Sequence, residues 1–313
     1  MFPDLPEDIG RLVFELAAET TAGPHYALVS RKVQSWVEPI IYRSIILAGP
    51  ATTSLLYRTI ADPNTRKTAE FFAQHVKFLT VRTWDYPEVE MQTILRACRG
   101  VKVLTNWGTF YPTCRAFQTV FSSSYLSPSR LSILGDSLLP QEHWRMDFSL
   151  PVFQNLTHLE VRRIAAEGPW NKWDGLSLLG NLTHFSVTTR SLPPPDVEWV
   201  KGILARCPAT LRIFIICIPF NSISRGGLGE FPLINKGDAD LRAVLAVKFW
   251  TRQDLQRDYP HSHFEYALPR ARYEEHLRDW VGRTAGKDFW ELAEEVVERR
   301  REWLQKTHSA PPA

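Results

Sequence analysis

The length, composition and charge of the chain limit the classes of protein to which it can belong. Its 313 residues, 44% of them hydrophobic, can bury the core of one elongated domain or two compact ones. A formal net charge of +3, from 37 basic and 34 acidic residues, is far below the concentrated positive charge typical of nucleic-acid or membrane-surface binding. Asp4, Glu7 and Asp8 stand where a signal peptide would be basic and then apolar, and no apolar run approaches the roughly 18–20 residues that span a bilayer. We therefore expect a cytoplasmic or nuclear protein that binds neither nucleic acid nor membrane.

Residues 5–46 predict a small bundle of helices. Two segments in this range carry apolar residues at helical spacing, so we expect them to pack together through these stripes. Gly23-Pro24 separates the first helix from the next, and Pro39 bends or ends the last. Phe14 lies off the first stripe, so we expect it to contact either another protein or the first repeat. The stripes are Ile9, Leu12, Val13, Leu16 and Ala17, and Val33, Trp36, Val37, Ile40 and Ile41.

The same residues resemble an F-box motif. The matching positions, in the order and spacing of that motif, are Leu5-Pro6-x-Asp8-Ile9, Val13-Phe14-x-Leu16, Leu28-Val29-Ser30-Arg31, Trp36, Pro39 and Tyr42. Residues 22–25, AGPH, depart from it, because the second helix of the motif starts with an acidic residue and a leucine. The resemblance implies a three-helix F-box module at residues 1–49 that binds a Skp-family adaptor and, through it, a cullin. It places the adaptor contact at Leu5, Pro6, Ile9 and Phe14.

The segment NLTH occurs twice, at residues 155–158 and 181–184, 26 positions apart. Each copy is formally an acceptor for N-glycosylation, but the expected intracellular location excludes that modification. Each copy also begins an apolar LxxLxL-like frame, and related frames recur along the chain at intervals of 25 to 31 residues. This recurrence predicts a repeat protein. We expect the central apolar residues of the frames to point into one core; they are Leu79, Leu104, Leu131, Leu159, Phe185, Phe214 and Leu245.

The segments between these frames predict the fold class. Residues 88–98 have apolar side chains at helical spacing, and residues 197–207 follow a run of three prolines that stops the preceding element. Alternating short strands and return segments resemble irregular leucine-rich repeats of the F-box type, which implies an α/β fold with a curved, parallel-stranded solenoid at residues 65–255. A doubly wound α/β domain remains the alternative, because the asparagines lie outside the consensus position of the repeat. It is less favoured because no glycine-rich phosphate loop follows any strand.

Alternation of side chains along the strands predicts the surface that binds a protein substrate. Residues flanking each central position share the face of the sheet opposite the core. On that face we expect a mixture of charges and exposed aromatic side chains, which is typical of protein interfaces. Ile213 and Ile215 break the polar pattern, so either the C-terminal segment or a partner should cover them. The predicted substrate-binding residues are Arg82, Trp107, His158, Glu160, Arg162, His184, Lys248 and Trp250.

Residues 256–313 predict a helical C-terminal segment. Within residues 287–306, apolar residues at helical spacing form one stripe, and charged residues occupy the remaining positions. We expect this apolar face, with Trp303 and Leu304, to cap the open end of the solenoid. The stripe consists of Phe289, Leu292, Ala293, Val296 and Val297.

The sequence carries no motif for catalysis, metal binding or cofactor binding. His261 and His263, with Asp258 and Glu265 nearby, lack further ligands at the spacing of a zinc site. Residues 226–229, GGLG, lack the Lys-Ser/Thr of a phosphate loop. The cysteines form no CxxC pair; they are Cys98, Cys114, Cys207 and Cys217. We therefore predict a non-catalytic protein without metal or cofactor.

An F-box followed by irregular leucine-rich repeats resembles the substrate receptors of SCF-type cullin–RING ubiquitin ligases, particularly divergent fungal ones. This resemblance implies that the chain binds a Skp-family adaptor with its N-terminal module and an unidentified protein substrate with its repeats. Two alternatives stay open. The chain could be a repeat scaffold outside any ligase, with the F-box-like segment as an N-terminal cap, or, less favoured, an α/β enzyme whose site has no recognisable motif.

Overall fold

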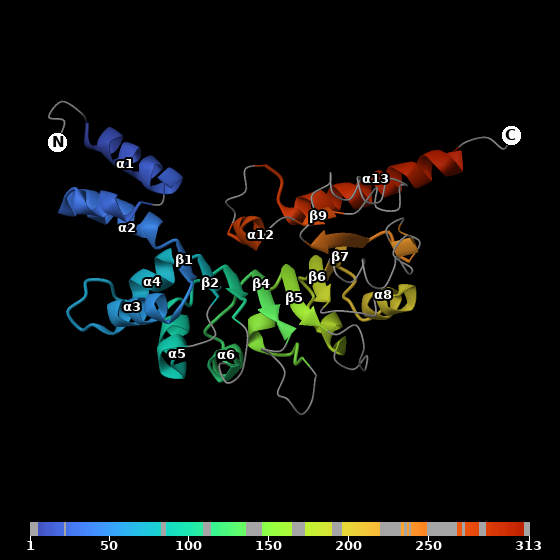
Figure 1. The fold of residues 1–313 in the computed structure, drawn as a ribbon, viewed down its shortest axis with the longest axis horizontal. Coiled ribbons are helices and arrows are strands. Elements are labelled where there is room, and N and C mark those ends of the chain that lie inside the picture. Colours follow the sequence, from blue (N-terminus) through green and yellow to red (C-terminus); the bar gives the residue numbers. More distant parts are fainter. Residues whose placement is uncertain are drawn as a thin grey trace.

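A computed structural model describes most of the chain and shows an elongated molecule built along one parallel sheet (Figure 1). A small helical module lies at the N-terminal end of the sheet, and helices cover both of its faces (Figure 1). Among the described residues, no helix has the length and apolar character needed to cross a membrane. The described residues are 6–21, 23–82, 86–108, 114–135, 146–164, 173–189, 196–219, 233–234, 237, 239–248, 268–270, 273–281 and 286–309.

The N-terminal module consists of α1 (Glu7–Thr21), the 3₁₀ helix η1 (Pro24–Leu28) and α2 (Arg31–Ile41). The hydroxyl of Ser30 caps α2 by accepting a hydrogen bond from the backbone N–H of Val33. Pro39 lies within the last turn of α2. Its small core is formed by Ala18, Val33 and Val37, with Phe14, Tyr26, Ala27, Trp36, Ile40 and Ile41 packed around them.

The predicted packing face of α1 is wrong. Leu12, Val13 and Leu16 are 51%, 54% and 52% exposed, whereas Phe14 packs into the core of the module with its ring edge-on to Tyr26. Phe14 and Ala18 are one turn apart and therefore share a helix face, and this face meets η1 and α2. The apolar stripe of α1 consequently points outward.

The described residues form a sheet of nine strands in sequential order, and all neighbouring pairs are parallel. This order excludes the doubly wound alternative, in which the strand order reverses. β1 lies within residues 1–49 and β9 within residues 256–313, so the sheet extends beyond residues 65–255 at both ends. The strands are β1 (Ser44–Leu47), β2 (Phe78–Val81), β3 (Val103–Asn106), β4 (Arg130–Leu134), β5 (His158–Ile164), β6 (His184–Thr189), β7 (Ile213–Pro219), β8 (Ala243–Lys248) and β9 (Leu268–Arg270).

The predicted repeat frames set the register of the sheet. Leu79, Leu104, Leu131, Leu159, Phe185 and Phe214 pair in one continuous row, and all of them are buried. Leu245 is also buried, but it pairs with Ile216, two residues farther along; Ala243 continues the row. The prediction of one shared core is confirmed. The last repeat is offset along its strand by two residues, which preserves the face that each side chain occupies.

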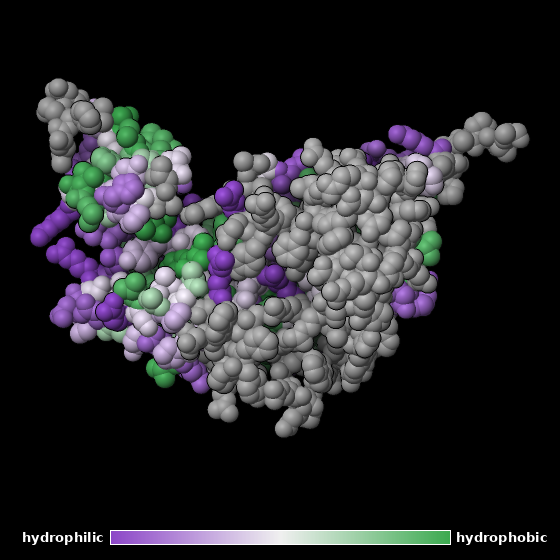
Figure 2. Space-filling model, in the orientation of Figure 1, coloured by the Kyte–Doolittle hydropathy of each residue, from purple (hydrophilic) through white to green (hydrophobic). Residues whose placement is uncertain are grey.

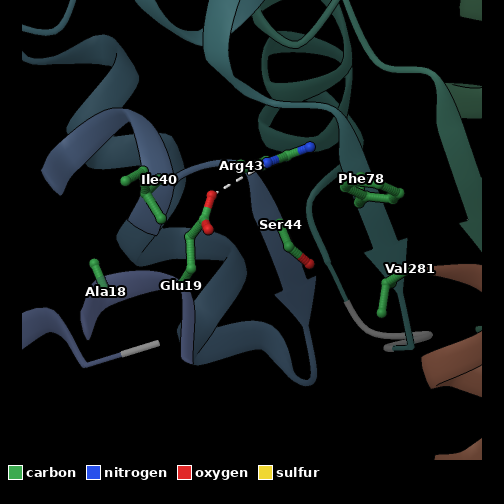
Figure 3. Close-up of a pocket in the computed structure, with 7 residues that line it drawn as sticks. All are labelled: Ala18, Glu19, Ile40, Arg43, Ser44, Phe78 and Val281. Carbon is green, nitrogen blue, oxygen red and sulfur yellow. Dashed lines mark ion pairs between the residues drawn. The ribbon is translucent and has the colours of Figure 1, made fainter. Parts of the chain in front are cut away.

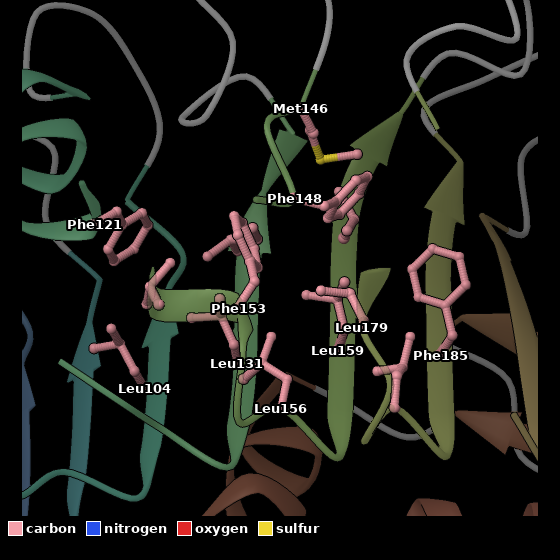
Figure 4. Close-up of a cluster of buried hydrophobic side chains, with 14 of the residues drawn as sticks. Leu104, Phe121, Leu131, Met146, Phe148, Phe153, Leu156, Leu159, Leu179 and Phe185 are labelled. Carbon is pink, nitrogen blue, oxygen red and sulfur yellow. The ribbon is translucent and has the colours of Figure 1, made fainter. Parts of the chain in front are cut away.

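Helices and short 3₁₀ turns pack against one face of the sheet and enclose the main hydrophobic core. Figure 4 shows Leu131, Leu159 and Phe185 projecting from successive strands toward aromatic side chains of the return segments. The return segments are α3 (Pro50–Ala61), α4 (Ala69–His75), α5 (Glu88–Ala97), α6 (Cys114–Phe121), η2 (Pro151–Phe153), η4 (Leu176–Leu178) and α8 (Val197–Leu204).

The two NLTH segments perform the same structural task in adjacent repeats. Leu156 and Leu182 are fully buried in the core. The Thr157 hydroxyl donates a hydrogen bond to the backbone carbonyl of Ser129 (3.0 Å), and the Thr183 hydroxyl donates to that of Thr157 (3.1 Å). The repeated threonines therefore connect each strand to the preceding one at its amino end, which explains the recurrence of the motif.

The C-terminal segment covers the opposite face of the sheet. It forms α12 (Tyr273–Trp280) and α13 (Phe289–Ser309), which lie across the sheet from α5, α6 and α8 (Figure 1). The expectation that Ile213 and Ile215 need a cover is confirmed, because they share a second buried cluster with α12 and α13. The segment was expected to cap the open end of the solenoid; instead, its helices lie along the sheet face.

Candidate functional site

Five of the eight predicted substrate-binding residues share one face of the sheet; they are Trp107, His158, Glu160, Arg162 and His184. His158 pairs with His184, and Glu160 and Arg162 follow on the same side of β5. This face is the one that α12 and α13 cover. The residues brought together by strand alternation are therefore placed beneath two helices, where they form buried polar contacts.

A chain of buried hydrogen bonds joins three strands to α12. The Trp107 indole N–H donates to the Ser132 hydroxyl (2.7 Å), and that hydroxyl donates to the Glu160 carboxylate (2.6 Å). His276 places its Nε2 3.0 Å from the same carboxylate oxygen, to which the protonated nitrogen donates. The Trp280 indole nitrogen packs 3.1 Å from that Nε2. Glu160 is 0% exposed, so these partners replace the water that a carboxylate would otherwise bind.

Trp107 is the aromatic centre of this cluster. The His276 ring stacks on it with a centroid distance of 5.3 Å and an angle of 9° between the planes. The guanidinium carbon of Arg162 lies 4.4 Å from the centroid of the Trp107 ring, within the range of a cation–π interaction. The arrangement of an indole face beside a buried carboxylate is suited to holding a planar, nitrogen-containing side chain.

A second polar cluster lies under α13. The rings of His158 and His184 stack at 4.2 Å with only 1° between their planes, and the edge of Trp290 packs against both. His184 Nε2 lies 3.1 Å from the carboxylate of Glu294. The two histidines of the NLTH repeats thus form a platform on which α13 rests.

Burial keeps both histidines neutral. Burial, together with the neighbouring His184 and Arg130, lowers the pKa of His158 to about 2. Burial also lowers the pKa of His184, although the carboxylate of Glu294 acts in the opposite direction. Stacked neutral imidazoles avoid the repulsion that two adjacent cations would suffer.

The amino end of α13 is fixed by capping and by an ion pair. Asp288 accepts hydrogen bonds from the backbone N–H groups of Trp290 and Glu291, both at 2.9 Å. Glu291 accepts one in return from the Asp288 N–H at 2.7 Å, which completes a reciprocal capping arrangement. Arg130, on β4, lies 3.4 Å from the other oxygen of Asp288. The helix start is therefore tied to the sheet.

The remaining predicted substrate-binding residues lie at strand ends or outside the described residues. Arg82 follows β2 and is partly exposed, and Lys248 is the last residue of β8. Trp250 lies outside the described residues. Sequence reasoning missed His276 and Trp280, although Leu277, Trp280 and Val281 have helical spacing that could have indicated a buried face.

The predicted adaptor-binding residues are divided by the structure. Leu5 lies outside the described residues, the exposed Pro6 precedes α1, Ile9 is exposed on α1, and Phe14 is part of the internal core. Figure 2 shows hydrophobic atoms gathered over this module. The exposed apolar residues there are Ile9, Leu12, Val13 and Leu16 on α1 and Leu28 and Val29 at the end of η1.

A pocket of about 220 Å³ lies where the module meets the sheet and α12 (Figure 3). The carboxylate of Glu19 and the guanidinium of Arg43 lie 3.7 Å apart at its edge. Its other lining residues come from α1, α2, β1, β2 and the end of α12; they are Ala18, Ile40, Ser44, Phe78 and Val281. This mixed lining combines an apolar floor with one ion pair.

The described residues contain no group of three or more His, Cys, Asp or Glu side chains that could hold a metal ion. The His261-Ser262-His263 segment and residues 226–229 lie outside them. Burial raises the pKa of the Cys98 and Cys207 thiols to about 12, which makes both poor nucleophiles.

No family model matches the chain, and no curated protein matches it in sequence. Among solved structures, the chain is similar to the leucine-rich repeat-containing protein LegL7 from Legionella pneumophila, with a TM-score of 0.39 and 13% sequence identity over 70% of this chain and 86% of that one. The sequential strand order of the chain's own parallel sheet defines its fold.

Proposed function

We propose that this chain is a non-catalytic interaction protein that acts as the substrate receptor of an SCF-type cullin–RING ligase. Its N-terminal module binds a Skp-family adaptor, and its repeat region holds a protein substrate. The observation that carries the proposal is the outward apolar stripe of α1, because a monomeric protein rarely leaves such a surface uncovered.

The stripe has the form of a helix that docks into a groove. Ile9, Leu12, Val13 and Leu16 recur at the spacing of one helix face. Leu28 and Val29, which are 85% and 60% exposed, add an apolar turn from the same module. This proposed contact includes Pro6 and Ile9, and the resemblance to the F-box adds Leu5. Phe14 supports α1 from inside the core of the module.

The module is firmly attached to the repeats. Tyr42, which follows α2, packs edge-on against Phe71 and Phe72 of α4 at 5.5 and 5.6 Å. Lys67 pairs with Glu38 of α2 at 2.8 Å, and both side chains are largely buried. A bound adaptor would therefore keep a defined orientation relative to the sheet, which is what a receptor that positions its substrate requires.

Co-purification with a Skp-family adaptor tests the proposal. We expect Leu12→Asp with Leu16→Asp to reduce adaptor binding by at least about a hundredfold, because charges would enter a desolvated apolar contact. The matched control is Val89→Asp, since Val89 is similarly exposed but lies on α5. Failure of the unmutated, folded chain to bind any Skp-family protein would overturn the proposal.

The second candidate function is a repeat scaffold outside any ligase. The packing of Tyr42 on α4 favours it, because the same contacts would let the module serve as an N-terminal cap of the sheet. A cap does not need an exposed apolar stripe. The adaptor experiment therefore separates the two candidates.

A further inference from the structure

We propose that the floor around Glu160 is a binding site for a short amphipathic helix that carries a histidine, and that α12 occupies this site as an internal ligand. This inference rests on the proposed role of the chain as an interaction protein, but it does not require that the chain binds an adaptor. It assigns the substrate-binding role to a defined part of the sheet and explains why that part is covered.

The covered face of the sheet has two chemically different halves. On β7 and β8 it is apolar, with Ile213, Ile215 and Val244 buried against the C-terminal helices. On β2 to β5 the same face is mixed: beside the apolar Phe78 and Val103 it presents the buried polar side chains Thr80, Thr105, Ser132 and Glu160. A layer that serves only as core is expected to be apolar throughout, because each buried polar group must find a hydrogen-bond partner.

α12 and α13 share the cover of this face, and only the floor around Glu160 is assigned to α12 through His276. α13 packs on β7, β8 and β9 through Trp290, Ala293 and Val297 among others. α12 lies over the polar half through the contacts of His276 with Trp107 and Glu160. The 21-residue α13 thus covers the apolar half and the His158–His184 platform, whereas the floor around Glu160 lies under the eight-residue α12.

The contacts of His276 have the character of ligand recognition. Its ring lies parallel to the Trp107 indole, and its Nε2 reaches the buried Glu160 carboxylate. Ser132 holds the carboxylate in place from the sheet side. A planar ring on an aromatic face with one nitrogen on a buried carboxylate is a specific, directional contact.

We expect α12 to detach while α13 stays in place. The apolar contacts of α12 are made by Leu277, Trp280 and the adjoining Val281. The rings of His276 and Trp280 also pack edge-on against Phe289 and Trp290 of α13, with centroid distances of 5.8 and 6.0 Å. A helix of eight residues is unstable in isolation, so its structure depends on the site that it occupies. Trp290 and the histidine platform would keep α13 in place after α12 detached.

A labelled peptide tests the site in the full-length chain. The probe is a fluorescein-labelled peptide with the sequence of residues 271–284, ARYEEHLRDWVGRT. The control peptide has the same sequence with alanine at the position of His276. Fluorescence anisotropy measures binding to the unmutated chain and to His276→Ala. We expect His276→Ala to bind the histidine peptide at least about tenfold more tightly than the unmutated chain does, because its own α12 competes less well.

Matched variants test whether peptide binding depends on the contact between the histidine and the Glu160 carboxylate. Glu160→Gln added to His276→Ala should weaken peptide binding at least about tenfold, since a neutral amide replaces the charged acceptor. Arg278→Ala, at an exposed position of α12, should behave like the unmutated chain. The alanine peptide should not bind any variant.

Two results would overturn the inference. One is a folded His276→Ala chain that binds the histidine peptide no better than the unmutated chain. The other is equal binding of the histidine and alanine peptides. Should His276→Ala fail to fold, Leu277→Ala weakens the apolar hold of α12 and leaves the floor intact, so the same comparison applies to it. Because no adaptor is present, failure here leaves the adaptor proposal unaffected.

Discussion

At the scale of single residues, the face opposite the main core uses polar side chains as structural partners. Glu160 and His184 were predicted to meet a substrate, yet both are buried against the C-terminal helices. Strand alternation identified the face on which they lie, because that depends only on local geometry. It could not identify the cover, since the partner of Glu160 is 116 residues away in the sequence.

The histidine platform predicts a pH dependence of stability. His158 and His184 have lowered pKa values in the folded state, so the unfolded chain binds more protons below the ordinary histidine pKa of about 6.5. Folding stability therefore rises with pH in this range and is lost as the pH falls from about 6.5 toward the folded pKa, which is about 2 for His158. Each histidine can contribute up to about 1.4 kcal/mol per pH unit.

Urea unfolding at pH 7 and pH 5 checks this sign. We expect His158→Gln with His184→Gln to lose less free energy of unfolding between the two pH values than the unmutated chain does. His25→Gln is the control, because His25 is exposed on η1. An unchanged pH dependence in the double variant would contradict the assignment of neutral buried histidines.

At the scale of elements, the sequence predicted the structure best where the same frame of apolar residues recurs at a regular interval. The frames centred on Leu79 through Phe214 predicted parallel strands and one buried row, and the register confirms them. α1 was harder to predict, because it carries an apolar stripe on one face and Phe14 with Ala18 on another. Periodicity alone cannot decide which apolar face turns inward when a small module leaves the other exposed.

α12 carries only a weak periodic signal, the helical spacing of Leu277, Trp280 and Val281. It has only eight residues, about two helical turns, and charged residues such as Glu274 and Arg278 occupy several of its positions. Its burial depends on Trp107 and Glu160, which lie on distant strands. Contacts of this kind are set by the tertiary structure and leave no local pattern in the sequence.

The role of α13 as a structural cover leads to a stability prediction. Trp290 is buried among His158, His184, Trp280 and Phe289, so Trp290→Ala should lower the free energy of unfolding by about 3–5 kcal/mol. Urea denaturation measures the difference.

Trp303 provides the control on the same helix, since it is 58% exposed. Trp303→Ala should change the free energy of unfolding by about 0.5 kcal/mol or less, as is usual for exposed positions. Equal effects of the two substitutions would mean that α13 is not anchored through Trp290.

At the scale of the whole molecule, apolar surface is buried at one end and exposed at the other. The C-terminal helices cover the apolar strands β7 and β8, whereas the N-terminal module presents its stripe to solvent. The contacts of Tyr42 and Lys67 join the module to the repeats as one unit. This asymmetry favours the N-terminal end as the place where a partner adds its surface.

Hydrogen–deuterium exchange of the full chain, with and without a Skp-family adaptor, tests this central claim most directly. The account predicts slower amide exchange in α1 and around Leu28 and Val29 when the adaptor is added, because docking stabilises the helix whose stripe it covers. Exchange in β4, β5 and β6 should remain the same. Unchanged exchange in α1 at saturating adaptor, or protection confined to the sheet, would contradict it.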